Sequence, residues 1–569
     1  MNRPKKNWII YPKAPQKFFD SQKEFSPLFV QLLYNRGLKN KKEIHSFLNP
    51  DYKKDTFSPF LFSEMEKSVS RILEGITRGE KILIWGDYDV DGITATIILF
   101  ETLKFLGAKN LDYYIPDKEK EGYGISLEIL NQKIKENFNL IITCDCGISA
   151  EKEIKKAQQL GVDVIVTDHH NPPSVLPPAF AILNPKLKKS NYPFEELSGS
   201  AVAFKLAQGI IYKKLGENNI LGENFLKWLL DIVALGILAD VVPMVSENRV
   251  LAKYGLLVLK KTKRPGLRLM YRIANINPEN LTTSDVIFKI VPRLNAAGRL
   301  ANAKIAFNLL SENDPTKAVV YAFELEKLND KRQRLESKIL KEARATIKIE
   351  KDQRILIVEG KGWPVGVLGI IAGRLKDEYG LPTIVFNKEN GIHIGSARSV
   401  DGFDITEVLS GLGDFLIKFG GHKKAAGLSL PEELFESFYE NLQKIAKEKI
   451  SQEEVLPSLH IDMECSFQDI TPHFIEEIKL LEPFGLLSPR PVFLTKNVII
   501  KDKKIFGSRK QHLKLLIKNG KIIKEALAFG WGFFDNFKKD QKVSIVWSWE
   551  ESSRTDNFEI KILDIQKEI

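Results

Sequence analysis

The sequence has few cysteines and no long apolar run, and each of these absences excludes a class of protein. It also has no internal repeat. Three cysteines in 569 residues are too few for a disulfide-stapled fold, and they fit a reducing cytosol. No stretch approaches the roughly 18 apolar residues that a membrane-spanning helix needs. The longest apolar segment, 232–244, is interrupted by Asp240. The N-terminus lacks the apolar core of a signal peptide. We therefore expect a cytoplasmic protein with no membrane segment.

What is present is length and positive charge. A chain of 569 residues and 64.7 kDa is too long for one hydrophobic core and should form three or four domains. The net charge is +11 and the pI is about 9.1. This balance favours a polyanionic partner, with nucleic acid first and an anionic membrane second.

Short β-branched runs alternate with helix-like segments in two parts of the chain, which predicts α/β domains with a parallel sheet in the first. A long amphipathic stripe between them predicts a connecting helix. Five short alternating runs near the C-terminus predict a small barrel such as an OB-fold. The expected divisions are an N-terminal segment (1–50), an α/β domain (51–310), a long helix (311–350), a smaller α/β domain (351–450) and a barrel (456–569).

The strongest chemical signal is GDYDVDG at 86–92, directly after the apolar run ILIWG. Three aspartates at alternate positions resemble the start of a calcium-binding EF-hand loop. Such a loop follows a helix and has Glu at its twelfth position, whereas here a strand-like run precedes it and position twelve is Ile98. The EF-hand interpretation fails, and a solvated acidic turn remains as the alternative.

The same arrangement recurs along the chain. Asp145 ends the run LIITC, Asp168-His169-His170 ends DVIVT, and Asp240 lies inside an apolar run. The carboxyl ends of parallel strands meet at one edge of a sheet, where ligands bind. Carboxylates with one imidazole suit Mn²⁺ or Mg²⁺. Two ions about 4 Å apart need a bridging carboxylate, for which Asp145 is the candidate.

Seven motifs in order resemble the DHH phosphoesterase superfamily, and within it the exonucleases specific for single-stranded DNA. The resemblance covers nearly the whole chain and includes the C-terminal barrel. It implies a parallel-sheet DHH catalytic domain, a DHH-associated domain and an OB-fold that binds DNA. The motifs are GDYDVDG, TCDCG (143–147), VTDHH (166–170), LADVVP (238–243), PRLNAAGRL (292–300), GSARS (395–399) and GGHKKAAG (420–427).

The resemblance also implies roles for single residues. One ion is expected on Asp89 and Asp145, and the other on Asp91, Asp145, His169 and Asp240. Asp87 and Asp168 are expected to bind or orient ligands and protons, and His170 and His422 to face the scissile phosphate. Arginine suits bidentate phosphate contact. The expected substrate-binding residues are Asn295, Arg299, Ser396, Arg398, Gly420 and Gly421.

Other features are weaker or depart from the family pattern. Pro364 stands where the family usually has a histidine, and Ser488 stands where it usually has an asparagine. Cys144 and Cys146 flank Asp145, but a zinc site would need more thiolates at suitable spacing, so small semi-buried residues at a strand end are the better interpretation. The glycines of GWPVGVLGIIAGRL (362–375) fit no phosphate-loop pattern and favour close helix packing.

The leading hypothesis is a metal-dependent exonuclease that degrades single-stranded DNA to mononucleotides in repair and recombination. The resemblance implies 5′-to-3′ polarity, and it suggests a single-strand-binding protein and a helicase as partners of a monomeric enzyme. One alternative is a phosphodiesterase or pyrophosphatase for short oligonucleotides or small phosphoesters, which would not need the barrel. Another is a non-catalytic DNA-binding scaffold, which would have lost metal ligands.

Overall fold

The computed structural model describes residues 6–122, 124–350, 352–450, 458–507, 510–532, 537–551 and 558–567. The chain divides into two compact units. Residues 45–335 and 482–488 form the parallel-sheet unit. Residues 1–44, 336–481 and 489–569 form the other unit, which we call the two-sheet unit after its two larger sheets. Within the described ranges, no helix has the length and apolar character needed to cross a membrane.

A five-stranded parallel sheet is the centre of the parallel-sheet unit, as predicted. Across the sheet its strands are β3 (Leu111–Tyr114), β2 (Ile82–Gly86), β4 (Leu140–Cys144), β5 (Asp163–Thr167) and β6 (Ala181–Leu183). β2 and β4 are buried along their whole length, because helices cover both faces. The chain runs from β2 to β3 on one side and returns to β4 on the other. The carboxyl ends of β2 and β4 therefore flank the switch point of the sheet, where ligands bind in such folds.

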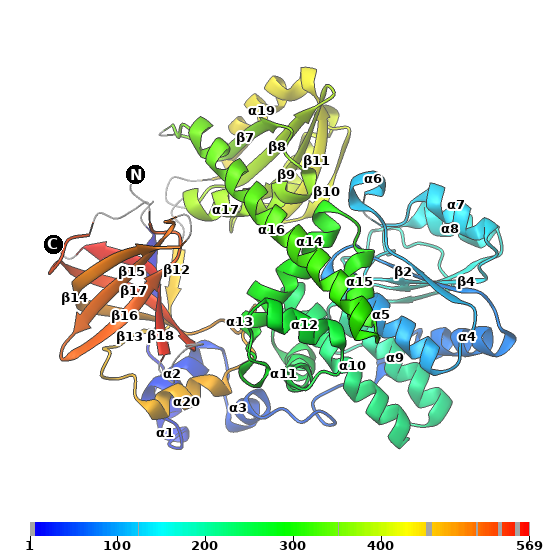
Figure 1. The fold of residues 1–569 in the computed structure, drawn as a ribbon, viewed down its shortest axis with the longest axis horizontal. Helices are drawn as coiled ribbons and strands as arrows, with labels where there is room; N and C mark the ends of the chain where they lie inside the picture. The colour runs from blue at the N-terminus through cyan, green and yellow to red at the C-terminus, as the bar shows by residue number, and fades with distance from the viewer. Residues whose placement is uncertain are drawn as a thin grey trace. The chain divides into compact units, whose positions relative to one another are not determined.

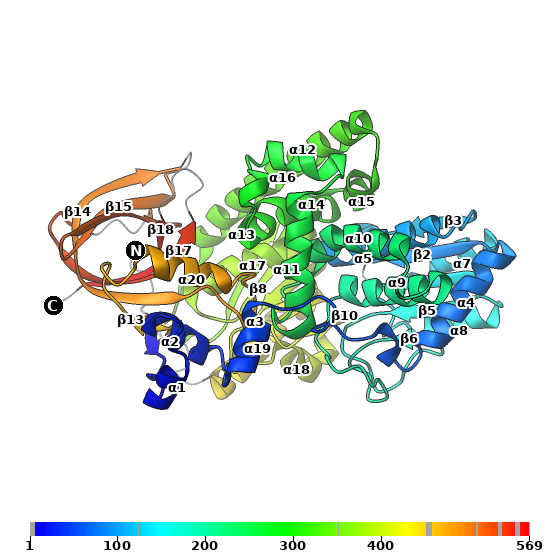
Figure 2. The same ribbon diagram turned by 90° about the horizontal axis from the view of Figure 1, so that it is seen from below.

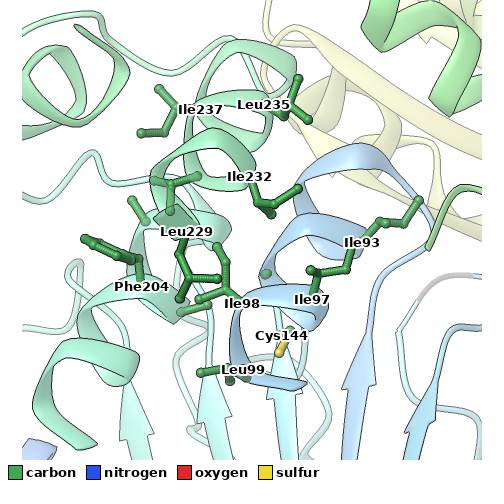
Figure 3. Close-up of a cluster of buried hydrophobic side chains, with 14 of the residues drawn as sticks. Ile93, Ile97, Ile98, Leu99, Cys144, Phe204, Leu229, Ile232, Leu235 and Ile237 are labelled. Carbon is green, nitrogen blue, oxygen red and sulfur yellow. The ribbon is translucent and has the colours of Figure 1, made fainter. Parts of the chain in front are cut away.

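Helices cover both faces of this sheet (Figure 1), and a hydrophobic core lies on each face. One core contains side chains from α5 (Val90–Phe105), α9 (Gly199–Leu215) and α10 (Ile220–Ala239). Figure 3 shows Ile98 of α5 packed beside Phe204 of α9 and Leu229 of α10. The other core lies under α7 (Leu127–Lys135) and α8 (Glu151–Gln159). The sheet is thus held rigidly from both faces, and its carboxyl edge carries the polar residues.

Further helices complete this unit and lead out of it. They are α4 (Met65–Arg78), α6 (Lys118–Glu121), α11 (Ser246–Lys260), α12 (Pro265–Ile273), α13 (Thr283–Asp285), α14 (Val291–Leu300) and α15 (Lys304–Ser311). The long helix expected after residue 311 is α16 (Pro315–Thr346), a continuous helix of 32 residues.

The first sheet of the two-sheet unit is mixed. β7 and β8 are parallel, and the remaining neighbours are antiparallel. Its strands in order are β10 (Lys418–His422), β11 (Ala425–Pro431), β9 (Ile392–Arg398), β8 (Thr383–Glu389) and β7 (Leu356–Lys361). Its helices are α17 (Val365–Tyr379), α18 (Ile405–Gly411) and α19 (Phe435–Lys449). This is the smaller α/β domain that the sequence predicts.

The second sheet of the two-sheet unit closes into a five-stranded barrel, as expected for an OB-fold. Its strands are β14 (Val492–Phe506), β15 (His512–Asn519), β16 (Ile522–Ala528), β18 (Phe558–Lys567) and β17 (Lys542–Glu551), and β17 pairs back onto β14. Figure 2 shows β14 and β15 curving around the barrel. β13 (Met463–Glu464) extends this sheet by pairing with β14, and β1 (Asn7–Ile10) and β12 (Ser458–Ile461) form a separate two-stranded parallel sheet. The helices outside the barrel are α1 (Gln16–Ser21), α2 (Pro27–Asn35), α3 (Lys41–Leu48) and α20 (Pro472–Leu480).

Candidate metal centre and phosphate-binding residues

The acidic residues predicted from the strand ends converge at the carboxyl edge of the parallel sheet. Asp87, Asp145 and Asp168 directly follow β2, β4 and β5, and all three are buried. Asp145 has a φ of 60°, a left-handed conformation that is uncommon outside glycine and is often found at functional sites. The chain has turned sharply at the end of β4, at the switch point of the sheet.

Three groups of side chains have ligand atoms that all lie within 4.8 Å of one another. Two of the groups share Asp145, and two share His169, so the set is continuous. The groups are Asp87–Asp89–Asp145, Asp91–His169–Asp240 and Asp145–His169–His170. Every residue predicted as a metal ligand is present in at least one of them.

Several buried polar atoms in this cluster lack a hydrogen-bond partner. They are Asp87 Oδ1, Asp145 Oδ1 and His169 Nε2. His169 Nε2 is 3.1 Å from Asp145 Oδ1 and 3.5 Å from Asp240 Oδ2, yet neither contact is aligned as a hydrogen bond. Buried polar atoms nearly always have a hydrogen-bond partner. These three unpaired atoms are instead of the kind that bind divalent cations. Oxygen ligands with one imidazole nitrogen fit Mn²⁺ and Mg²⁺.

The pKa values of these side chains also indicate a metal site. Burial, reinforced by neighbouring aspartates, raises the pKa of Asp145 and Asp240 well above the ordinary value. The same causes raise the pKa of Asp91 to about 6. Burial and the neighbouring His170 lower the pKa of His169 to about 3. His169 is therefore neutral at physiological pH, as a metal ligand must be, and the carboxylates repel each other unless cations or protons separate them.

Asp91 is held by the amino end of α9. Its two carboxylate oxygens accept hydrogen bonds from Gly199 N at 2.6 Å and Ser200 N at 2.9 Å, where the helix dipole favours negative charge. Gly199 also permits the close approach of α9 to Asp145, since a Cβ there would lie 2.5 Å from Asp145 Oδ1. Gly199 and Ser200 were not predicted as site residues from the sequence. Ser198, the N-cap of α9, precedes an apolar run and is the signal that marks this helix start.

Asp168 orients the second histidine of the triplet. Its Oδ1 accepts hydrogen bonds from His170 N and lies 2.7 Å from His170 Nδ1, and its Oδ2 accepts one from Ile148 N. Burial would raise the pKa of Asp168, but the hydrogen bonds and charge of His170 lower it below the ordinary value. The carboxylate stays ionised and fixes the ring of His170, whose Nε2 is then the nitrogen suited to contact a phosphate.

Helix α14 fastens the GDYDVDG loop and carries two predicted substrate-binding residues. Asn295 Oδ1 accepts a hydrogen bond from Val90 N at 3.2 Å, so this oxygen supports the loop. A Cβ at Gly298 would lie 2.5 Å from Tyr88 O, which shows how closely the helix and loop pack. Burial raises the pKa of the Tyr88 phenol, and the charge of Arg299 opposes that rise. Arg299 is thus close to the loop that carries the metal-ligand candidates.

The remaining predicted phosphate-binding residues gather in the mixed sheet of the two-sheet unit. Gly420 and Ser396 both pair with Gly427 of the strand between them, and Arg398 pairs with Ala425. The adjacent Gly421 and His422 are on the exposed strand β10. A Cβ at Gly421 would lie 2.3 Å from Ala425 O, so only glycine fits there. Their roles in binding substrate remain predictions.

Arg398 depends on a glycine in the neighbouring helix. A Cβ at Gly369 of α17 would lie 2.7 Å from Arg398 Nη2 and 3.0 Å from Ser396 Oγ. Arg398 Nη1 also donates a hydrogen bond to Ala397 O at 2.8 Å. The predicted close packing of this glycine-rich helix therefore places a guanidinium group beside the helix backbone.

The departures from the family pattern have structural counterparts. Pro364 is the N-cap of α17 and offers no polar side chain. Ser488 is fully buried, and its Oγ has no hydrogen-bond partner.

Cys144 and Cys146 are free and more deeply buried than the sequence suggests. Burial raises the pKa of both thiols, so they remain protonated and pack as small apolar side chains.

Comparison with known proteins identifies the family. The model of the DHH family, N-terminal domain, matches residues 81–237, the DHHA1 domain model matches 352–451, and the RecJ OB domain model matches 461–563. The single-stranded-DNA-specific exonuclease RecJ of Haemophilus influenzae is 35% identical over 521 residues, covering 88% of this chain and 89% of that protein. The chain belongs to the RecJ family.

Other RecJ proteins agree with this assignment. RecJ of Bacillus subtilis is 38% identical over 519 residues, which are 91% of this chain and 64% of that longer protein. The crystal structure of RecJ from Thermus thermophilus in complex with Mn²⁺ superposes with a TM-score of 0.82 at 27% identity, covering 99% of this chain and 80% of that one. The superfamily and fold inferred from the motifs are thus confirmed, and that relative binds one of the expected metals.

The raised carboxylate pKa values predict how metal-free protein responds to pH. The pKa of Asp91 is about 6 when folded and about 3.9 in an unfolded chain, so the folded state binds more protons between these values. The stability that Asp91 contributes is therefore present below about pH 4 and lost as the pH rises through about 6. Mn²⁺ at a hundred times its dissociation constant should restore about 2.7 kcal/mol at neutral pH.

Thermal melting in EDTA and in Mn²⁺ across this pH range measures both effects. Asp145→Asn removes one repelling charge, so the metal-free variant should melt higher than the metal-free wild type at neutral pH and gain little from Mn²⁺. A wild-type melting temperature that does not respond to Mn²⁺ would contradict the site.

The packing of α17 predicts that Gly369→Ala displaces Arg398 without unfolding the protein, because the contacted atom ends a flexible side chain. Gly373→Ala is the matched control: it is one turn further along the helix, with no atom within 4 Å of the added Cβ. Both changes should keep or raise the melting temperature, since alanine favours a helix. Steady-state kinetics on single-stranded DNA should show about a tenfold or greater loss of kcat/KM for Gly369→Ala alone, the scale of one lost charged hydrogen bond. Equal kinetics for the two variants would show that Arg398 needs no such placement.

Proposed function

We propose that the protein is a divalent-metal-dependent exonuclease that degrades single-stranded DNA from its 5′ end to 5′-mononucleotides, in DNA repair and recombination. The observation that carries this proposal is the buried set of aspartates around Asp145, with unsatisfied oxygens and a neutral His169. The relatives named single-stranded-DNA-specific exonucleases support the substrate.

The groups of side chains support two ligand sets, and the proposal adds Asp145 to the group of Asp91, His169 and Asp240. Asp89 and Asp145 would hold one ion, and Asp91, Asp145, His169 and Asp240 would hold the other, with Asp87 beside the first set. When bound, two Mn²⁺ or Mg²⁺ ions supply positive charge that polarises the phosphate, lowers the pKa of a water and stabilises the leaving 3′-oxygen. Asp145 is common to both proposed sets, and its Oδ1 lies 3.1 Å from His169 Nε2 of the second set.

The other predicted residues have defined tasks in this proposal. His170, oriented by Asp168, donates a hydrogen bond to the scissile phosphate through Nε2. Arg299 neutralises charge on the strand beside the GDYDVDG loop. In the DHH-associated domain, Ser396, Arg398 and the backbone of Gly420 and Gly421 bind a phosphate, and His422 contacts it from the edge strand.

The barrel supports a long substrate rather than a small phosphoester. Residues 501–525 contain nine Lys or Arg and two acidic residues. Lys501, Lys503, Lys504, Lys514, Lys518 and Lys524 lie on β14, β15 and β16, which pair in this order in the barrel. Such a basic surface tracks the backbone of a single strand. We retain the division into segments 1–50, 51–310, 311–350, 351–450 and 456–569 as part of this proposal, together with a monomeric cytoplasmic enzyme that works with a single-strand-binding protein and a helicase.

End-labelled oligonucleotides test the proposal. With Mn²⁺, wild-type protein should release the 5′ label first, as a mononucleotide, from single strands but not from duplexes. Asp145→Asn should lower the rate by at least about a hundredfold, the scale of losing one group that stabilises the transition state. Asp112→Asn is the matched control, since Asp112 is an exposed aspartate on β3 of the same sheet and should leave the rate unchanged.

The same assay separates the alternatives. A phosphodiesterase for short substrates would hydrolyse dinucleotides faster than long strands, and a scaffold would bind long strands without metal-dependent loss of nucleotides. Either result would reject the proposal.

A further inference from the structure

A short hairpin turn displays two leucines to solvent in the parallel-sheet unit. Gly485 and Ser488 exchange backbone hydrogen bonds of 3.0 and 3.1 Å, so Leu486 and Leu487 form the tip of the turn. Leu486 is 49% exposed and Leu487 is 62% exposed. Hairpin tips of this length normally carry glycine, asparagine or aspartate. Two exposed leucines are therefore an unusual choice at this position.

The turn is fixed to the segment that follows Asp240, one of the metal-ligand candidates. Met244 N donates a 2.7 Å hydrogen bond to Leu486 O, and Leu486 forms a parallel bridge with Pro243. Pro243 follows Asp240 by three residues, and Val241, which directly follows Asp240, is 64% exposed. Chain geometry then places the Cα atoms of Leu486 and Val241 within about 12 Å of each other. We call Val241, Leu486 and Leu487 the apolar tip.

The base of the turn is rigid. The buried guanidinium of Arg249 donates hydrogen bonds of 3.0 Å to both Glu482 O and Pro483 O. A Cβ at Gly485 would lie 2.9 Å from Met244 Cβ, so the turn packs tightly against the segment after Asp240. The exposure of the leucines is thus imposed by a well-anchored base.

Two residues of the apolar tip adopt backbone conformations that their side chains disfavour. Val241 has a φ of 59° and Leu487 a φ of 61°, in the left-handed region where a β-branched or bulky residue is an outlier. Burial does not compensate for this cost, because both side chains are mostly exposed. Strained residues of this kind cluster at ligand-binding sites, so an apolar ligand group is the expected compensation.

We propose that the apolar tip packs against an unpaired nucleobase of the substrate strand, close to the scissile phosphate. This inference rests on the proposed function. The bases are the apolar surfaces of DNA, and their faces are available in a single strand but stacked in a duplex. Contact between the tip and a base face therefore contributes to binding and to the preference for single strands, in the way that sequence-tolerant base contacts do in other single-strand-binding proteins.

Leu487→Gly tests the proposal, because stability and binding should change in opposite directions. Glycine adopts a φ of 61° without strain, so the melting temperature should rise. The KM for single-stranded DNA should increase about tenfold, the ratio expected when about 50 Å² of apolar surface is no longer buried. Val241→Asn should have the same two effects, since asparagine tolerates this conformation.

Leu221→Ala is the matched control, because it removes exposed apolar surface from the opposite end of the helix that leads to Asp240. That end is about 29 Å away, so KM should not change.

A strand with abasic sites near its degraded end gives the decisive comparison. Wild type should show an approximately tenfold higher KM for the abasic strand than for the normal strand, and Leu487→Gly should show nearly equal values.

The outcomes separate this inference from the proposed function. If wild-type protein with Mn²⁺ degrades no strand at all, the proposed function is rejected. An active wild type with an unchanged KM in Leu487→Gly, or a lowered melting temperature in that variant, would reject the base contact alone. So would an equal penalty for abasic strands in both proteins.

Discussion

Mutual repulsion among buried carboxylates is the constraint on which this structure depends. The buried Asp87, Asp91 and Asp145 and the half-buried Asp240 are brought close together, and such an arrangement is unstable for anions unless they are protonated or bound to cations. The fold holds them in place nonetheless, because a sheet covered on both faces by helices fixes the strand ends. The site is thus prepared for divalent cations before they bind.

Supporting contacts come from elements distant in sequence. The amino end of α9 stabilises Asp91, α14 fastens the GDYDVDG loop through Asn295, and Asp168 sets the orientation of His170. Each contact limits the freedom of a side chain that would otherwise move away from its neighbours. Pre-organisation of this kind is what orients ligands and tunes their basicity in metal sites.

Much of this could be predicted from the sequence because strand ends are local signals. Asp87 and Asp145 each follow a short β-branched run, and parallel strands necessarily bring such ends together. The approach of Gly199 to Asp145, the space that Gly369 leaves for Arg398, and the strained leucine tip could not be predicted. They depend on contacts between elements far apart in the chain, and a single glycine or leucine carries no local sign of what will pack against it.

The central claim is that one carboxylate cluster holds two cations through a shared Asp145, and the number of ions bound tests it most directly. Calorimetric titration of metal-free protein with Mn²⁺ should show two sites per chain in the wild type. Asp89→Asn should weaken one site, whereas Asp145→Asn should weaken both. A single site in wild-type protein, or two intact sites in Asp145→Asn, would contradict the account.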